Sequence, residues 1–128
     1  MKAILDSVRV GNTIHHVHDS FAKALAKYGM KKESRIGYSY GIGFPPDWGE
    51  NSFSVRENDM TIIKEGMCIH FILGCGDDWD YEFSEAIIVR ADGPELLCTN
   101  PRILYMSEEE YDLDNQELNT ETYFPHIM

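Results

Sequence analysis

The chain has 128 residues, of which 43% are hydrophobic and 26% are charged, and this composition is ordinary for one soluble globular domain. Its formal net charge of −11 argues against nucleic-acid binding, which depends on clustered Lys and Arg. No apolar run is long enough for a membrane span, and the N-terminus lacks the apolar core of a signal peptide. We therefore expect a cytoplasmic protein without nucleic-acid or membrane partners.

Helical patterns come first in the chain. An apolar element is predicted to end at Gly11, a residue type that often follows a helix C-terminus. Asn12 or Thr13 then caps a helix that runs to about Tyr28 and stops at Gly29. Its apolar residues recur three and four positions apart and predict one buried stripe, formed by Ile14, Val17, Phe21, Leu25 and Tyr28.

His15 and His18 are three positions apart on this helix, so they share one face. Two imidazoles at that spacing could in principle bind one metal ion, including an adventitious one. Both lie off the apolar stripe, however, and no HExxH arrangement is present. We favour a solvated pair of histidines.

Extended segments follow the helix. They are predicted at Arg35–Ile42, Met67–Leu73, Tyr81–Arg90, Glu95–Cys98 and, as a last piece, Pro101–Met106. The second and third should form a hairpin, and a tight turn at Ala91–Pro94 continues it into a meander. Between the first two, residues 51–60 are polar and irregular, with Arg56, Glu57 and Asp59 available for ion pairs. The three cysteines, which include no CxxC pair, are interpreted as reduced packing residues.

The C-terminal residues differ from the rest in charge. Ser107–Met128 holds seven of the 22 acidic residues and no Lys or Arg. With few apolar residues, this tail should be loose or lie along another surface, such as a basic protein partner. We predict a folded domain over residues 1–106 and an acidic tail over residues 107–128. Met1 is compatible with a natural start and with a boundary inside a longer protein.

The stretch Gly37–Glu50, GYSYGIGFPPDWGE, predicts a strand that enters a rigid loop. Short motifs follow one another in a fixed order after the helix that follows Gly11. They are GIG at residues 41–43, EGM at 65–67, SEAIIV at 84–89, ADGPELL at 91–97 and PRIL at 101–104. This order resembles the pita-bread superfamily of creatinase, methionine aminopeptidase, prolidase and Xaa-Pro dipeptidases. The resemblance covers about residues 3–106 and implies an α+β fold: one half of a pita-bread domain, with a helix packed on a mainly antiparallel, curved sheet.

The resemblance also implies what is missing. Peptidases of the superfamily hold two divalent ions with two Asp, one His and two Glu, and both Asp would precede Met1. The family histidine falls on Tyr40, one glutamate falls near Ile72, and the last has its counterpart in Glu85. No metal cofactor is therefore expected. The amino-acid sequence of the Gly37–Glu50 stretch is most similar to that of ectoine hydrolase and its creatinase-like relatives. These enzymes cleave C–N bonds without the usual metal pair.

Candidate site residues follow from this resemblance. Glu85 and His70 are the expected catalytic pair, since one lies on an apolar strand and the other suits proton transfer near neutral pH. A small polar or cationic substrate would be bound by Tyr40, Asp47, Trp48 and Glu50. The structural alternatives are a hairpin contact between Glu85 and His70, a turn cap for Asp47 and a core position for Trp48.

Two functions remain open at this point. The first is a metal-independent C–N hydrolase half that is incomplete alone and is completed by a complementary half-domain. The second is a non-catalytic module that binds a protein or forms a homodimer, because a lone half of a pseudo-twofold fold should expose apolar surface and a sheet edge.

Overall fold

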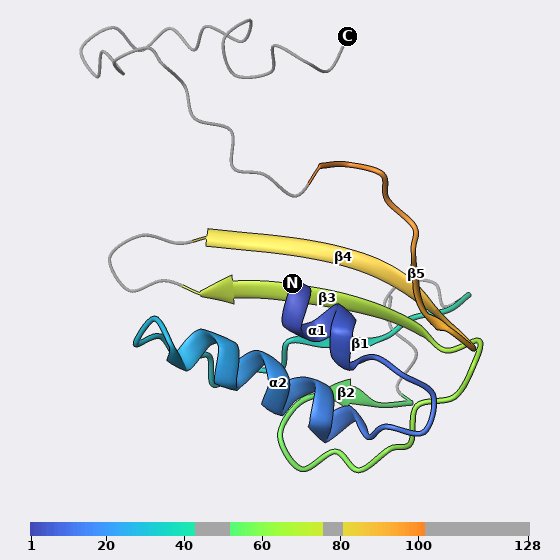
Figure 1. The fold of residues 1–128 in the computed structure, drawn as a ribbon, viewed down its shortest axis with the longest axis horizontal. Coiled ribbons are helices and arrows are strands. Elements are labelled where there is room, and N and C mark those ends of the chain that lie inside the picture. The colour runs from blue at the N-terminus through green and yellow to red at the C-terminus, as the bar shows by residue number, and fades with distance from the viewer. Residues whose placement is uncertain (43–51, 76–80, 102–128) are drawn as a thin grey trace, which may run out of the picture.

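A computed structural model describes residues 1–42, 52–75 and 81–101. Within these ranges, two helices and five strands are formed (Figure 1). The elements are α1 (Lys2–Ser7), α2 (Ile14–Ala26), β1 (Gly37–Ser39), β2 (Ser54–Val55), β3 (Cys68–Cys75), β4 (Tyr81–Arg90) and β5 (Gly93–Leu96). None of these helices is long and apolar enough to cross a membrane.

The strands form one antiparallel sheet in the order β2-β1-β3-β4-β5. Its centre is the predicted hairpin of β3 and β4, which run side by side and bend together in Figure 1. Both helices lie on the same face of this sheet (Figure 1), and α1 packs against α2 and β5. The predicted α+β arrangement, helices on a mainly antiparallel sheet, is thus confirmed.

Helix α2 begins and ends on local signals in the sequence. The Thr13 hydroxyl accepts a hydrogen bond from the backbone N–H of His16, which identifies Thr13 as the N-cap. Gly29 has a φ of 70°, a left-handed conformation that suits glycine after a helix. The helix ends at Ala26, so the prediction that Tyr28 joins the buried stripe is wrong: its side chain is 80% exposed.

Burial alternates along the two long strands. On β3, Ile69 and Phe71 are fully buried, whereas His70 between them is half-buried. Successive side chains of a strand point to opposite faces, so one face of the sheet packs under the helices and the other does not. We call the second face the open face. The core between sheet and helices consists of Ile4, Val8, Ile14, Val17, Phe21, Ile36, Phe53, Val55, Ile63, Ile69, Phe71, Leu73, Ile87 and Val89.

Several predicted details differ from the structure. β1 is shorter than the predicted Arg35–Ile42, and β2 lies in the segment expected to be irregular. Among the described residues Asp59 makes no ion pair; its carboxylate accepts backbone N–H groups of Ser54 and Thr61 instead. Cys98 is exposed rather than packed. The predicted tail and the end of the last extended piece lie outside the described residues.

Candidate active site on the open face

A row of side chains crosses the open face from strand to strand. The register places Tyr38 of β1 between Ser54 of β2 and His70 of β3, and His70 lies opposite Ala86 of β4. Residues directly opposite each other in antiparallel strands have side chains on the same face. His70, a predicted catalytic residue, is therefore held in the middle of the sheet with a small alanine on its β4 side.

His70 has a defined partner in this row. Its Nδ1 atom is 3.0 Å from the Tyr38 hydroxyl, and the two rings meet edge to face with centroids 5.3 Å apart. The Arg35 guanidinium lies over the Tyr38 ring, with its Cζ atom 4.8 Å from the ring centroid. With Nδ1 bonded to Tyr38, Nε2 is the ring nitrogen left to meet a ligand.

Close approach of β1 to β3 makes this contact possible. Gly37 precedes Tyr38, and a Cβ atom at Gly37 would lie 2.6 Å from the carbonyl oxygen of His70 and 3.1 Å from the Phe71 ring. Only glycine allows the two backbones to lie so near each other. The glycine of the GYS sequence thus determines how near Tyr38 comes to His70.

Tyr40, a predicted substrate-binding residue, lies just beyond β1. Its backbone N–H donates to the carbonyl of Cys68 and continues the β1–β3 ladder by one residue. Burial raises the pKa of Tyr40, and the nearby Cys68 thiol adds to this effect. The Tyr40 hydroxyl is buried and has no hydrogen-bond partner of good geometry among the described residues. The phenol of Tyr40 is therefore held neutral next to Cys68, one residue beyond the end of β1.

Glu85, the other predicted catalytic residue, takes a different position. It lies opposite Phe71 rather than His70, and its side chain is 6% exposed, in step with buried Ile87 and Val89. Side chains that differ by one position in the register of a strand point to opposite faces of the sheet. Glu85 and His70 consequently occupy opposite faces, and the alternative of a Glu85–His70 hairpin contact is wrong.

Sequence reasoning missed Tyr38 and Arg35. The alternation of Tyr38 with Ser39 and Tyr40 was visible, but nothing local shows which residue of β3 a tyrosine of β1 will face. Three other predicted substrate-binding residues, Asp47, Trp48 and Glu50, lie outside the described residues.

The sequence pattern of Metallopeptidase family M24 matches residues 1–91. The chain belongs to this family. Over 104 residues it is 38% identical to the ectoine hydrolase of Halomonas elongata, a match that covers 80% of this chain and 26% of that protein. It is also 33% identical over 105 residues to the uncharacterized hydrolase/peptidase y4tM of Sinorhizobium fredii, covering 81% of this chain and 27% of the relative.

Solved structures support the same assignment at the level of the fold. The prolidase of Pyrococcus horikoshii matches 81% of this chain and 30% of its own length, with a TM-score of 0.71 and 21% identity. The dipeptidase PepE of Mycobacterium ulcerans matches 78% of this chain and 27% of its own length, with a TM-score of 0.69 and 20% identity. The predicted pita-bread fold is confirmed, and this M24 chain spans about a quarter of the length of the curated relatives it matches.

The side chains that the structure describes do not fit a two-ion centre. Tyr40 and Ile72 stand where the resemblance expects a histidine and a glutamate, and neither offers a carboxylate or an imidazole. Glu85 offers a carboxylate, but the register between β3 and β4 places it on the face of the sheet that the helices cover. Among the described residues, no three His, Cys, Asp or Glu side chains are placed to hold an ion.

His15 and His18 are half-buried, not fully solvated, and line a pocket of about 680 Å³ beside α2. The His15 Nδ1 atom accepts a hydrogen bond from the backbone N–H of Asn58, at 3.1 Å. The pKa of His18 is lowered, chiefly by burial and further by His15, against the raising effect of Glu57 and Asp19. His15 therefore links α2 to the loop after β2, and His18 faces the same pocket.

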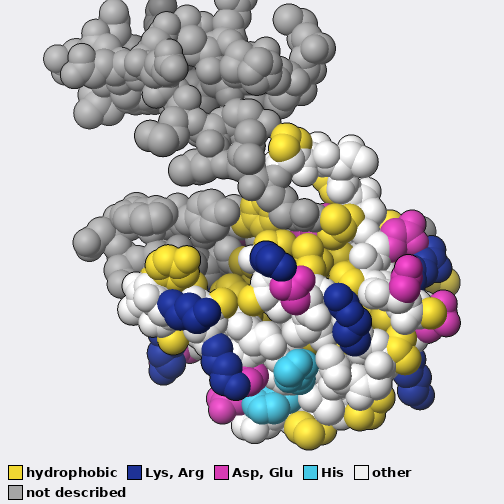
Figure 2. Space-filling view, viewed as in Figure 1, with side chains coloured by type: hydrophobic (Ala, Val, Ile, Leu, Met, Phe, Trp, Pro, Cys, Tyr) yellow, Lys and Arg dark blue, Asp and Glu magenta, His cyan; other side chains and the backbone are white. Residues whose placement is uncertain are grey.

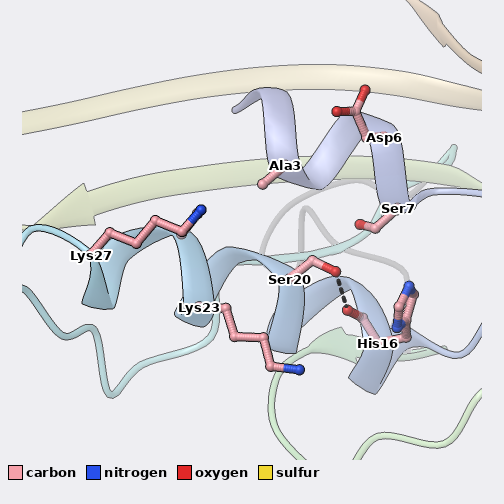
Figure 3. A pocket seen from close by; sticks show the side chains of 8 residues that line it. Ala3, Asp6, Ser7, His16, Ser20, Lys23 and Lys27 are labelled. Atoms are coloured by element: carbon pink, nitrogen blue, oxygen red, sulfur yellow. Dashed lines mark hydrogen bonds between the residues drawn. The ribbon is translucent and has the colours of Figure 1, made fainter.

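A second hollow lies between α1 and α2 and has a volume of about 370 Å³. Figure 3 shows that Asp6, Lys23 and Lys27 on its walls point in different directions instead of converging. Figure 2 shows Lys, acidic and His side chains on this helical side, with hydrophobic side chains gathered above them in the view. Because the charged side chains of this hollow do not converge, the open face is the better candidate site.

Proposed function

We propose that the open face is one wall of a C–N hydrolase site of the ectoine hydrolase type, acting on a small polar or cationic substrate. The observation that carries the proposal is the position of His70: a half-buried histidine with Nδ1 bonded to the Tyr38 hydroxyl, on the side of the sheet away from the helices. The 38% identity to an ectoine hydrolase supports the choice of substrate class.

Hydrolysis of a C–N bond needs proton transfer at two points. Water loses a proton as its oxygen bonds to the carbon, and the nitrogen gains a proton as the C–N bond breaks. We assign proton transfer to His70 and hydrogen-bond donation to the neutral Tyr40 hydroxyl. Asp47, Trp48 and Glu50 stay predicted substrate contacts. The other wall would come from a complementary half-domain.

The experiment compares the chain alone with the chain co-expressed with the N-terminal portion of an ectoine hydrolase, using ectoine as substrate and NMR to follow ring opening. We expect turnover only in the complemented sample, and a loss of at least about 100-fold for His70→Asn, the scale of a missing acid or base. Tyr28→Phe, at an exposed position, is the matched control. Absence of turnover in a folded, complemented sample would sink the proposal.

Glu85→Gln decides the role of the other predicted catalytic residue. Its burial opposite Phe71 leads us to expect a lower thermal midpoint with turnover reduced only in proportion to folded protein. Turnover lost from a variant with an unchanged midpoint would instead restore Glu85 as a catalytic residue.

The alternative function is a non-catalytic, cytoplasmic homodimer. Exposed apolar side chains favour it, since Ile42 is 92% and Leu97 49% exposed, and a second copy could cover them. Native mass spectrometry at micromolar concentration tests this alternative. A purely monomeric mass contradicts it, whereas a dimer that never turns over ectoine, with or without the complementary portion, favours it over the hydrolase.

A further inference from the structure

Three side chains of the open face form a series of contacts that ends at His70. Arg35 lies over the Tyr38 ring, with 4.8 Å from Cζ to the centroid, and its Nη1 atom is 3.4 Å from the Ser54 hydroxyl. The Tyr38 hydroxyl in turn lies 3.0 Å from His70 Nδ1. The register Ser54–Tyr38–His70 holds this series in place through backbone hydrogen bonds on both sides of β1.

The hydrogen bond between Tyr38 and His70 can run in two directions. Either the phenol donates to Nδ1, or an Nδ1–H donates to the phenol oxygen. A cation over the ring is attracted to its electron density, which it draws away from the phenol oxygen. The hydroxyl of Tyr38 thereby becomes a better donor and a poorer acceptor, which favours donation to Nδ1.

Within the described part of β3 and β4, no charged side chain neighbours His70 on the open face. Its neighbours on the open face of β3 and β4 are uncharged: Cys68, Ile72, Ser84, Ala86 and Ile88. A carboxylate next to a histidine would capture a ring N–H and set the tautomer itself. Without one among these neighbours, the contact with Tyr38 decides which nitrogen carries the proton.

We propose that Tyr38, polarised by Arg35, is a positioning residue that keeps neutral His70 protonated on Nε2. This inference rests on the proposed function for its meaning: an Nε2–H pointing to a ligand makes His70 a hydrogen-bond donor to the leaving nitrogen. When the Nε2 proton passes to that nitrogen, the Tyr38 hydroxyl proton moves to Nδ1, so the imidazole stays neutral and the phenolate forms beneath the Arg35 guanidinium. The base that takes the proton from water would then be another group. Tyr38 acts through His70 and need not touch the substrate.

The test reads the His70 ring directly and needs no turnover. The full chain is labelled with ¹⁵N-histidine and studied by long-range ¹H–¹⁵N correlation at about pH 8, where an ordinary imidazole is neutral. His70→Gln identifies the His70 signals. We expect the shift pattern of an Nε2–H ring in the wild type, a changed Nδ1 shift in Tyr38→Phe and a smaller change of the same sign in Arg35→Gln. Tyr28→Phe should leave all signals in place.

An Nδ1–H pattern in the wild type, or a Tyr38→Phe spectrum identical to wild type, overturns the inference. If Tyr38→Phe fails to fold, the wild-type pattern and Arg35→Gln still decide it. The two proposals fail separately. The Nε2–H pattern without any turnover in the complemented sample rejects only the hydrolase, and turnover with an Nδ1–H ring rejects only the role of Tyr38.

Discussion

The two faces of the sheet differ in what their side chains do. Ile69 and Phe71 of β3 point under the helices and are fully buried, while His70 between them is half-buried and bonded to a tyrosine. Burial of apolar area is the main source of folding stability, whereas a proton-transfer residue must be reachable by a ligand. Because strand side chains alternate, three consecutive residues thus divide between the packed core and the face that carries the proposed site.

The sharpest test of this difference compares adjacent residues. Phe71→Ala removes a fully buried ring and should cost about 3–5 kcal/mol of unfolding free energy. His70→Ala removes a half-buried ring with one hydrogen bond and should cost about 1 kcal/mol. Urea denaturation of both variants measures the difference between these two losses of unfolding free energy. Similar losses would show that the open face carries as much stability as the core.

The close approach of β1 to β3 at Gly37 can be tested by adding one methyl group. Gly37→Ala places a methyl group against the backbone of His70, which cannot move as a side-chain tip could, so we expect a loss of about 1–3 kcal/mol. Gly11→Ala is the control: nothing lies within 4 Å of its Cβ position, and only its φ of +92° resists alanine, at about 1–2 kcal/mol. The Tyr38–His70 contact should be disturbed in the first variant alone, which the ¹⁵N-histidine spectrum reports.

The helix that covers the buried face can be weakened without touching the open face. Thr13→Ala removes the N-cap of α2 and should lower stability by about 1 kcal/mol. Ser20→Ala is the matched control, because the Ser20 hydroxyl only adds a bond to the His16 carbonyl, and a change within about 0.5 kcal/mol is expected. Thermal unfolding separates the two, and an unchanged His70 spectrum in both would confirm that the faces are independent.

The smallest expected effect is a pH dependence on the helical side. Burial holds the pKa of His18 below its ordinary value of 6.5, so the unfolded chain takes up this proton first as the pH falls. The unfolding free energy should therefore drop as the pH is lowered from about 6.5 through the folded pKa. The pH dependence of the thermal midpoint should be weaker in His18→Gln over this window. His16→Gln, at an exposed position, is the control and should keep the wild-type pH dependence.

The sequence by itself determined the local elements. Thr13 caps the start of α2, and Gly29 follows its end at Ala26 within three residues. The apolar pattern together with the turn at Ala91 delimits β4, which spans the predicted residues. These signals work because a cap, a left-handed glycine and an alternating strand each depend on neighbours in the chain. The order of the motifs was likewise enough to predict the family, because it can be read without knowing which residues are in contact.

Only the tertiary structure decided which side chains meet. The pairing of Tyr38 with His70, the separation of Glu85 from His70 and the short β2 all depend on register between strands that are distant in the sequence. A slip of one residue would exchange the buried and open faces while leaving every local signal intact. Packing of Phe71 under the helices fixes the register, and with it the residue that can reach a ligand.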